Sequence, residues 1–350
     1  MAFVQGARLG LVADVGGTNA RFALALLRPH GSGSRCDLHA AASLHAADYP
    51  SLAAAGRAYL DEIVPGMDLD EVIAKRVGSP PRPKIAAFAI AGPILGEEVR
   101  FTNSPWSFNT AELADALRVH KLLILNDFEA LANGLPFLKP EECHRIGGGE
   151  ATDDGAISVV GPGTGLGVGS IVPVTTATGR HWHALPAEGG HVDLAARTPR
   201  EFAIVQSMMK AGGRVSAERA LSGPGLEAIH TAILSVDGHE SKPATAAEIT
   251  ERALAGGDAL ADETVRLFVT WLGRLSGDVA LTVGSRGGVF IGGGICPRIL
   301  PLMERFGFRA AFEDKGRLKP FVEAVPTQVI LSNAAALTGA GAALAQAEGI

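Results

Sequence analysis

The sequence predicts a duplicated α/β fold, on the basis of two similar glycine turns and a repeated order of strands and helices. Residues 9–27 form an apolar run, a turn at Gly16-Gly17 and a second apolar run. Residues 157–172 repeat this pattern around Gly163-Thr164-Gly165. Apolar runs joined by a glycine turn are typical of paired strands, and helices follow the strands in each half of the chain. Two such halves predict two α/β domains of related plan.

The first turn has the features of a phosphate-binding loop, although a plain hairpin explains it equally well. Glycines permit positive φ and the close approach of another group, and Thr18 and Asn19 add side-chain donors to the backbone amides. The sequence contains no Gly-x-Gly-x-x-Gly spacing and no Gly-Lys pair, which excludes the dinucleotide fingerprint and the P-loop. The pair of hairpins is more specific than either turn, and it predicts two domains that face one phosphate chain from opposite sides.

Composition excludes several classes of protein. A chain of 350 residues with 47% hydrophobic and 19% charged residues has room for two packed domains and is not broadly disordered. Its net charge of −6 gives no electrostatic footprint for nucleic acid. Cys36, Cys143 and Cys296 lie far apart, which argues against a disulfide framework and predicts a reducing cytoplasm. We expect a soluble cytoplasmic protein without a signal peptide or membrane segment, because no apolar run approaches the roughly 20 residues that span a bilayer.

Two short patterns have spacings that a metal ion could use. They are His181-Trp182-His183 and His191-Val192-Asp193. Neither has a third and a fourth ligand nearby, so we expect that neither binds a metal.

The elements of the first half follow from apolar spacing and turn chemistry. Residues 28–35 predict a polar turn before a third, short strand, and residues 51–63 have apolar side chains at helical spacing. Residues 66–84, with three prolines and mixed charge, predict a surface excursion. The apolar run at 85–91 predicts a buried strand, and residues 99–106 predict an edge strand that leads into a loop.

A capped helix and a buried strand complete this half. Asn109 and Glu112 form a pair resembling a capping box at the start of a helix. Residues 122–125 predict a buried strand that ends at Asn126-Asp127. A helix from about residue 128 to 136 then closes the half.

The second half repeats this plan with longer helices. Strands flank residues 161–169, and another strand begins at 182–186. Thr245 and Glu248 form a capping box for a helix that reaches Ala255, and apolar spacing predicts a long helix over 262–283. The remaining elements are helices at 201–210 and 224–234, strands at 288–291 and 325–331, and an Ala/Leu-rich helix at 333–346.

Polar residues follow the ends of several predicted strands, where open α/β sheets bind ligands. They are Asn103-Ser104 in a loop, Asn126-Asp127 after a buried strand, Glu188 and His191 beside a glycine-rich turn, and Glu218 at the start of a short helical segment. Alone, Asp127 is typical of a helix N-cap. Together these groups could line one sugar-sized site, because each charged acceptor contributes about 1.5–3 kcal/mol when it binds a hydroxyl.

Short motifs run along nearly the whole chain. They are Asp14-Val15-Gly16-Gly17-Thr18-Asn19-Ala20-Arg21, Thr102-Asn103 with Trp106, Asn126-Asp127-Phe128, Gly163-Thr164-Gly165-Leu166-Gly167, Glu188-Gly189-Gly190-His191-Val192-Asp193, Ser216-Ala217-Glu218-Arg219, Leu221-Ser222-Gly223-Pro224-Gly225, residues 288–295 and residues 307–316. In combination they resemble the bacterial glucokinases of the hexokinase–actin-like ATPase superfamily. The resemblance is to the branch outside the repressor/kinase group, whose cysteine-rich zinc motif is missing from this sequence.

This resemblance implies the fold and the assembly. The expected fold is a pair of actin-like ATPase (ribonuclease H-like) α/β domains with an interdomain cleft. The smaller domain is expected at 1–137 plus 333–350 and the larger at 138–332. A homodimer is expected from the family. Residues 66–84 look longer than the family pattern, which affects only that local surface.

The resemblance also implies a set of site residues. The expected glucose contacts are Asn103, Asn126, Asp127, Glu188, His191 and Glu218, with Asp127 as the catalytic base. The expected ATP-binding residues are Ala13, Asp14, Val15, Gly16, Gly17, Thr18 and Asn19 in a first phosphate loop, Gly163, Thr164 and Gly165 in a second, and Gly292, Gly293 and Gly294 in the adenosine segment. Mg²⁺ is expected to arrive with the nucleotide.

The implied reaction is ATP-dependent phosphorylation of glucose to glucose 6-phosphate, the first step of glucose catabolism. Such transfer relies on positioning and charge stabilisation, with Asp127 accepting the proton of the sugar 6-hydroxyl and Mg²⁺ bridging the β- and γ-phosphates. Two other classes stay open. A sugar-responsive regulator would need a DNA-reading domain, for which a first strand near residue 8 leaves no room. An acyl-phosphate kinase or filament-forming ATPase would have no obvious use for the sugar acceptors.

Overall fold

The computed structural model describes residues 7–30, 33–67, 82–92, 94, 96–101, 106–176, 179–239 and 242–350. The chain forms two compact units. The first comprises Met1–Leu138, Pro173–Ala184 and Asn333–Ile350, and the second comprises Lys139–Val172 and Leu185–Ser332. Asn103 and most of the predicted excursion at 66–84 lie outside the described residues. The domain boundaries proposed from the sequence stay a prediction.

The sheet of the first unit has the strand order β3-β2-β1-β4-β7. Its strands are β1 (Arg8–Val15), β2 (Asn19–His30), β3 (Gly33–His45), β4 (Ile85–Ile90) and β7 (Lys121–Asn126). The first three strands are antiparallel, and β4 and β7 continue parallel to β1. The predicted hairpin at 9–27 is therefore confirmed, as is the buried strand β4. Strand β7 also forms as predicted, but it lies at the edge of the sheet and only Leu125 in it is buried.

The third strand is confirmed, but the predicted turn at 28–35 is too long and the strand is not short. Strand β2 continues to His30 and β3 resumes at Gly33, so the third strand is 13 residues long. The extended strands are consistent with their charge pairing, because the Asp37 carboxylate accepts hydrogen bonds from Arg28 across the hairpin and from Arg35 on its own strand. Polar residues predict a turn only where no partner strand pairs with them.

Alternation along β1 directs side chains to two separate cores. Leu11, Ala13 and Val15 pack with α1 (Leu52–Ala58) and α3 (Thr110–Leu117), whereas Val12 packs on the opposite face with α4 (Asp127–Gly134) and α12 (Ala335–Ala347). This is the period-two arrangement of a sheet covered on both faces.

One local prediction in this unit is confirmed and two need correction. Asn109 caps α3 by accepting hydrogen bonds from the amides of Ala111 and Glu112. The helix predicted over 51–63 is α-helical only to Ala58, followed by a π turn (Tyr59–Ile63) and a 3-10 turn (Val64–Gly66) that contains Pro65, which has no N–H to continue the helix. The edge strand predicted at 99–106 is short, β5 (Glu98–Arg100), and pairs with β6 (Ser107–Asn109).

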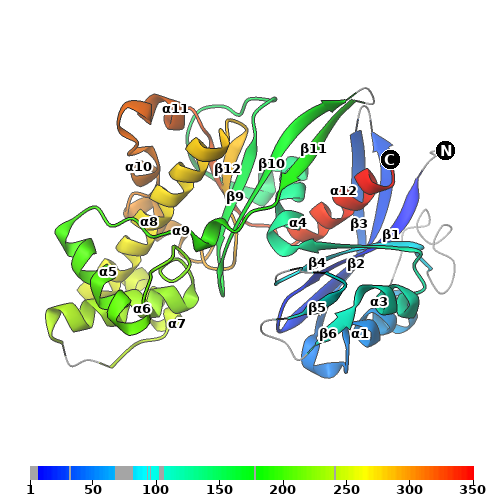
Figure 1. Ribbon diagram of the computed structural model, residues 1–350, viewed down its shortest axis with the longest axis horizontal. Helices are drawn as coiled ribbons and strands as arrows, with labels where there is room; N and C mark the ends of the chain where they lie inside the picture. The colour runs from blue at the N-terminus through cyan, green and yellow to red at the C-terminus, as the bar shows by residue number, and fades with distance from the viewer. Residues whose placement is uncertain are drawn as a thin grey trace. The chain divides into compact units, whose positions relative to one another are not determined.

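Helix α12 closes the first unit against α4, and the two helices lie alongside each other in Figure 1. Glycines allow this approach. A Cβ added at Gly339 would lie 1.7 Å from the Ala130 carbonyl oxygen, and one at Gly134 would lie 2.2 Å from that of Ala335. Because α4 begins at Asp127, the C-terminal helix helps to position that residue.

The second sheet repeats the order of the first, with one additional strand, as β11-β10-β9-β12-β13-β8. Its strands belong to the second unit except the end of β10 from Pro173 and β11 up to Ala184, which are counted with the first unit. Its strands are β8 (Cys143–Gly147), β9 (Ile157–Pro162), β10 (Leu166–Thr176), β11 (Gly179–Leu185), β12 (Gly288–Ile291) and β13 (Thr327–Ile330). Strands β9, β12 and β13 are parallel, like β1, β4 and β7. This repetition confirms the predicted duplicated α/β fold.

Helices of the second unit are longer, as predicted. They are α5 (Pro199–Gly212), α6 (Gly223–Asp237), α7 (Ala246–Ala255) and α8 (Ala259–Val283). Thr245 and Glu248 form the predicted capping box of α7. Within the described ranges, no helix combines the length and apolar character needed to cross a bilayer.

Four elements of the second unit were not predicted. They are the edge strand β8 and the short helices α9 (Leu300–Arg305), α10 (Phe308–Glu313) and α11 (Lys319–Glu323). Helix α10 packs closely on α8, where a Cβ at Gly273 would lie 2.5 Å from the Phe308 carbonyl oxygen. Elements of five or six residues contain too few turns for apolar periodicity to reveal them.

Candidate active site

The site residues of the first unit gather at one edge of its sheet. Val15, Ile90 and Asn126, the last residues of β1, β4 and β7, lie side by side in parallel register. The carboxyl ends of these strands therefore bring the first glycine turn next to Asn126-Asp127. Open α/β sheets bind ligands at such an edge.

The first glycine turn is short and partly exposed. The Gly16 amide donates to the Asn19 carbonyl at 2.9 Å, and Thr18 and Asn19 are exposed. Asp14 is paired across the hairpin with Arg21, and their charged atoms are 3.5 Å apart. Burial raises the pKa of Asp14, while the Arg21 guanidinium acts in the opposite direction. Because burial disfavours the charged form of Asp14, a nearby cation would stabilise its carboxylate.

Asp127 is the first residue of α4, whereas the N-cap is Asn126. The Asn126 side-chain oxygen accepts from the amides of Phe128 at 2.9 Å and Glu129 at 3.3 Å. One oxygen of half-buried Asp127 accepts from the Phe128 amide at 3.0 Å. The N-cap of α4 is thus Asn126 and not Asp127. Because the side-chain oxygen of Asn126 is used in the cap, its side-chain NH₂ group is the part that can donate to a ligand.

Glu129 was not identified as a candidate site residue from the sequence. It follows Asp127 in the first turn of α4, and burial raises its pKa, while the Asn126 amide and His183 act in the opposite direction. A second carboxyl group so near a strand end has no sequence signal of its own, because its effect depends on burial.

The glycine segments of the second unit also meet at one sheet edge. The turn at Gly163–Gly165 follows β9, and Gly292–Gly294 follows the neighbouring parallel strand β12. Gly293 has a φ of 77°, and a Cβ there would lie 2.2 Å from the Pro162 carbonyl oxygen. Only glycine fits this approach, so the two predicted ATP segments of this unit are adjacent.

The structure brings the three predicted sugar residues of the second unit to the same turn. Glu188 precedes a 3-10 turn (Gly189–His191) that His191 ends, and both residues are exposed. The Glu218 amide donates to the Gly190 carbonyl at 2.9 Å, and one Glu218 carboxylate oxygen accepts from the Leu166 amide at 2.9 Å. The prediction that Glu218 opens a helical segment is wrong. It lies in a hydrogen-bonded turn, and α6 begins at Gly223, where Ser222 caps it.

Arg214 is a further residue that sequence reasoning missed. Its guanidinium donates to the His191 carbonyl at 3.0 Å and to Asp193 at 2.7 Å. Asp193 in turn forms a β-bridge with Ser216, two residues before Glu218. Arg214 therefore links the His191 turn to the segment that leads to Glu218, through its hydrogen bonds to His191 and Asp193.

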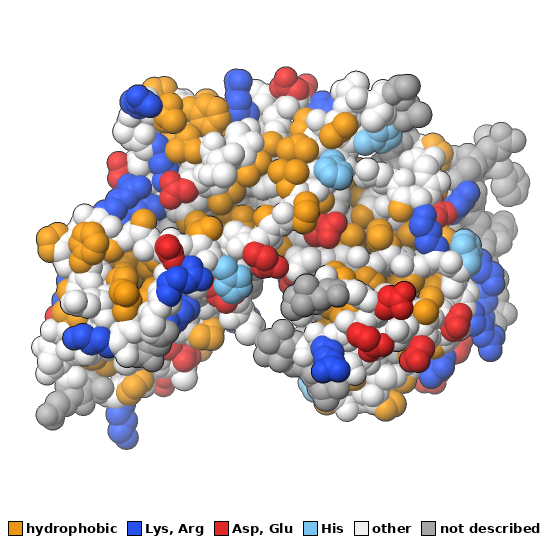
Figure 2. All heavy atoms as spheres, viewed as in Figure 1, with side chains coloured by type: hydrophobic (Ala, Val, Ile, Leu, Met, Phe, Trp, Pro, Cys, Tyr) orange, Lys and Arg blue, Asp and Glu red, His pale blue; other side chains and the backbone are white. Residues whose placement is uncertain are grey.

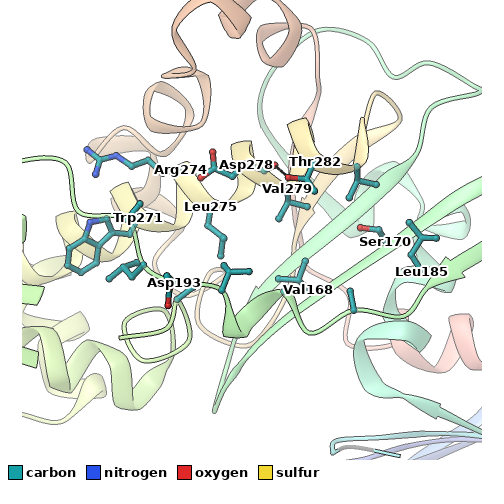
Figure 3. Close-up of a pocket in the computed structure, with 17 residues that line it drawn as sticks. Val168, Ser170, Leu185, Asp193, Trp271, Arg274, Leu275, Asp278, Val279 and Thr282 are labelled. Carbon is teal, nitrogen blue, oxygen red and sulfur yellow. Dashed lines mark hydrogen bonds between the residues drawn. The ribbon is translucent and has the colours of Figure 1, made fainter. Parts of the chain in front are cut away.

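A cavity of about 360 Å³ lies next to the segments that carry Glu188, His191 and Glu218. In Figure 3 Leu275 and Val279 of α8 lie opposite Val168 of β10. Gly189 and Ala217, neighbours of the sugar residues, complete part of its wall. Its lining is mainly apolar, although Ser170, Asp278 and Thr282 also contribute to it.

On the face in Figure 2, acidic and basic side chains are interspersed with apolar ones. Within the part of the chain that the structure describes, no three His, Cys, Asp or Glu residues cluster as a metal site would require.

Comparisons with known proteins identify the family. A sequence model of the glucokinase family matches residues 11–347. The chain belongs to the glucokinase family. It is 41% identical to a glucokinase of Salmonella typhi over 342 residues, which is 98% of each chain. A crystal structure of a glucokinase from an Antarctic psychrotroph matches with 34% identity and a TM-score of 0.82, covering 99% of this chain and 100% of that one.

A more distant structure shares the fold. A glucokinase of the ROK family from Streptomyces griseus, in complex with glucose and AMPPNP, has 18% identity and a TM-score of 0.52, covering 97% and 100% of the two chains. The predicted actin-like ATPase fold and glucokinase resemblance are confirmed. As a glucokinase, the protein is an enzyme that transfers a phosphoryl group from ATP to glucose.

Proposed function

We propose that Asp127 is the general base of this glucokinase and that groups from both units contact the substrates. The single observation that carries the proposal is the position of Asp127, which is the first residue of α4 and directly follows the carboxyl end of β7. A half-buried carboxylate there can accept the proton of the glucose 6-hydroxyl as phosphoryl transfer begins. Asn103, Asn126, Glu188, His191 and Glu218 complete the proposed sugar contacts, since each carries groups that hydrogen-bond hydroxyls.

Backbone amides of the glycine turns are proposed to hold the phosphates of ATP. The first phosphate loop comprises Ala13–Asn19, the second Gly163–Gly165, and Gly292–Gly294 contacts the adenosine. Two glycine segments of the second unit lie at one sheet edge, which supports this assignment. Amides in such turns act as fixed donors that need no reorganisation during transfer.

Mg²⁺ is proposed to bind together with the nucleotide. Asp14 fits this ion, because a hard carboxylate oxygen beside a phosphate-binding turn would repel the phosphates unless a cation were present. Magnesium commonly uses one or two carboxylates and substrate phosphates, so no larger acidic cluster is needed. When bound, the ion neutralises charge on the transferred phosphoryl group.

The cellular setting is proposed from the family and the composition. The Streptomyces griseus relative was solved with glucose and AMPPNP, which supports glucose and ATP as the substrates of this chain. The family supports a homodimer. The three cysteines, none of them disulfide-bonded, are consistent with a reducing cytoplasm. We place the enzyme at the first step of glucose catabolism.

The experiment is an assay of ADP release from ATP, Mg²⁺ and glucose, with Asp127→Asn beside the parent enzyme. Loss of the base should lower kcat by about 10²–10⁴-fold, whereas glucose binding by calorimetry should change little. Asp115→Asn is the matched control, since Asp115 is an exposed residue of α3 in the same unit. Parental turnover by Asp127→Asn would reject the assignment, and a parent that binds glucose without ADP release would indicate a sugar-responsive regulator.

A further inference from the structure

We propose that Glu218 positions the second glycine turn as well as contacting the sugar, and that it thereby couples glucose binding to nucleotide binding. The inference rests on the proposed function, which places Glu218 among the sugar contacts and Gly163–Gly165 among the phosphate contacts. It adds a role that neither assignment contains. Glu218 acts on the nucleotide through the backbone of another residue, so it is a positioning residue for that substrate.

The carboxylate of Glu218 lies directly against the turn. Its Oε2 accepts a hydrogen bond from the Leu166 amide at 2.9 Å. Leu166 is buried, with 6% of its surface exposed. A buried amide that loses its acceptor is costly, so this bond defines how the backbone leaves the turn. A Cβ added at Gly165 would lie only 2.6 Å from the same Oε2, which shows that the carboxylate occupies the space beside this glycine.

The backbone of Glu218 is held on both sides. Its amide donates to the Gly190 carbonyl at 2.9 Å, and its carbonyl accepts from the Ser222 hydroxyl at 2.8 Å. Gly190 belongs to the turn that carries His191. Ser222 caps α6, and the next residue, Gly223, donates its amide to the Gly163 carbonyl at 2.8 Å. Glu218 therefore connects the sugar turn and the phosphate turn through a continuous set of hydrogen bonds.

This geometry has a consequence for binding. A sugar hydroxyl that donates to Glu218 restricts the carboxylate, and a restricted carboxylate holds the Leu166 amide and the turn in one arrangement. A nucleotide that orders the turn restricts Glu218 in return. Because coupling between two sites is reciprocal, each substrate must change the affinity for the other by the same factor.

Glu188 provides the matched comparison. It belongs to the same proposed sugar set and carries the same functional group. Within the described residues, its side chain makes no hydrogen bond to the Gly163–Gly165 turn. Removing Glu188 should therefore affect the sugar alone, whereas removing Glu218 should affect both substrates.

The first experiment measures AMPPNP affinity by calorimetry in Mg²⁺ and without any sugar. Glu218→Ala should weaken binding by about tenfold, the effect of one buried amide left without its acceptor. Glu218→Gln should stay within about twofold of the parent, because its amide oxygen can still accept from Leu166. Glu188→Ala should bind AMPPNP like the parent. If Glu218→Ala also binds like the parent, the proposal is wrong.

The second experiment measures glucose affinity without nucleotide, after changes in the phosphate turn. Gly165→Ala should displace the Glu218 carboxylate and weaken glucose binding by about tenfold. Gly163→Ala is the control, because a Cβ there meets nothing within 4 Å, and it should retain parental glucose affinity. Equal glucose affinity in the two variants would contradict the coupling.

The two experiments distinguish a failure of the positioning role of Glu218 from a failure of the proposed function. A parent enzyme that binds neither AMPPNP nor glucose would reject the proposed function. A parent that phosphorylates glucose, with Glu218→Ala retaining AMPPNP affinity, would reject only the positioning role. If Glu218→Ala does not fold by circular dichroism, Glu218→Gln and Gly165→Ala still decide, since the former retains the hydrogen bond and the latter displaces it.

Discussion

The two glycine turns occupy equivalent places in the two units but are stabilised differently. The first, after β1, closes through Gly16 and Asn19, and its Thr18 carbonyl accepts from the Ala46 amide at 2.8 Å; its acidic residue, Asp14, comes from the preceding strand. The second, after β9, closes through Gly163 and Gly165 but is also held by Glu218, more than 50 residues later in the sequence. Duplication has kept the hairpin and changed the origin of the carboxylate.

This difference indicates a division of labour between the turns. The first turn is held by its own hairpin and by the Ala46 amide, and Ala46 is not among the proposed sugar contacts. A turn held by Glu218 is linked to the sugar segment, since Glu218 also binds Gly190. The first turn therefore has the simpler role of presenting amides and a cation partner, and the second has the means to sense whether sugar is bound.

The largest expected effect comes from Gly190→Ala compared with Gly16→Ala. A Cβ at Gly190 would lie 2.0 Å from the Leu166 carbonyl oxygen, whereas one at Gly16 meets its nearest atom, the Asn19 carbonyl oxygen, at an ordinary 3.7 Å. Gly190→Ala forces the sugar turn away from the phosphate turn, and we expect kcat/KM for glucose to fall by about 10²-fold or more, because misplacement of about 1 Å can cost that much. Steady-state kinetics of both variants measures this.

Gly16→Ala is expected to lower kcat/KM much less, with a thermal midpoint close to that of the parent. Thermal unfolding of both variants separates misfolding from misplacement. If the two substitutions reduce activity equally, the second turn is no more constrained than the first, and the comparison between them fails.

An intermediate effect concerns helix packing in the two units. Gly339→Ala should separate α12 from α4, and Gly273→Ala should separate α10 from α8. Each overpacked contact should lower the free energy of unfolding by about 1–3 kcal/mol. Only Gly339→Ala should also reduce kcat through α4, which begins at Asp127. Urea unfolding and kinetics measure both effects, and Gly66→Ala, with nothing within 4 Å of its Cβ, is the control.

Equal loss of kcat in Gly339→Ala and Gly273→Ala would show that α12 has no special part in positioning Asp127. Unchanged stability in both would show that the helices separate without cost.

The sequence predicted features whose cause is local. Both hairpins have the expected strand–glycine turn–strand pattern, β12 has the predicted bounds, and the capping box of α7 is confirmed. In each case the interacting residues are a few positions apart, so their spacing contains the information. The candidate site residues were proposed from glycine turns, from polar residues at strand ends and from the family motifs, and their roles stay predictions.

Features that depend on distant partners could not be predicted. Strand β8 forms its ladder with β13, which lies far along the chain. The ends of β2 and β3 are joined by the pairing of Arg28 with Asp37. Glu218 was predicted as a sugar contact, but its hydrogen bond to Leu166 spans 52 positions. Arg214 was missed because its hydrogen bonds are to His191 and Asp193, more than 20 positions earlier in the sequence. Glu129 was missed because its raised pKa results from burial.

The smallest expected effect is the acid sensitivity that His230 gives the second unit. His230 of α6 is 3% exposed, and its Nδ1 has no hydrogen-bond partner within the described residues. Burial, aided by Arg252 and opposed by Asp258, lowers its pKa below the ordinary 6.5. The unfolded chain therefore binds the proton first, so this contribution to stability is complete above about pH 6.5 and is lost as the pH falls toward the lowered pKa.

We expect the urea midpoint of the parent to fall more between pH 7.5 and 5.5 than that of His230→Leu, which has nothing to protonate. Carboxylates that titrate in the same range act in both proteins, so the difference between the two slopes isolates the histidine. Parallel slopes would show that His230 is accommodated in its charged form.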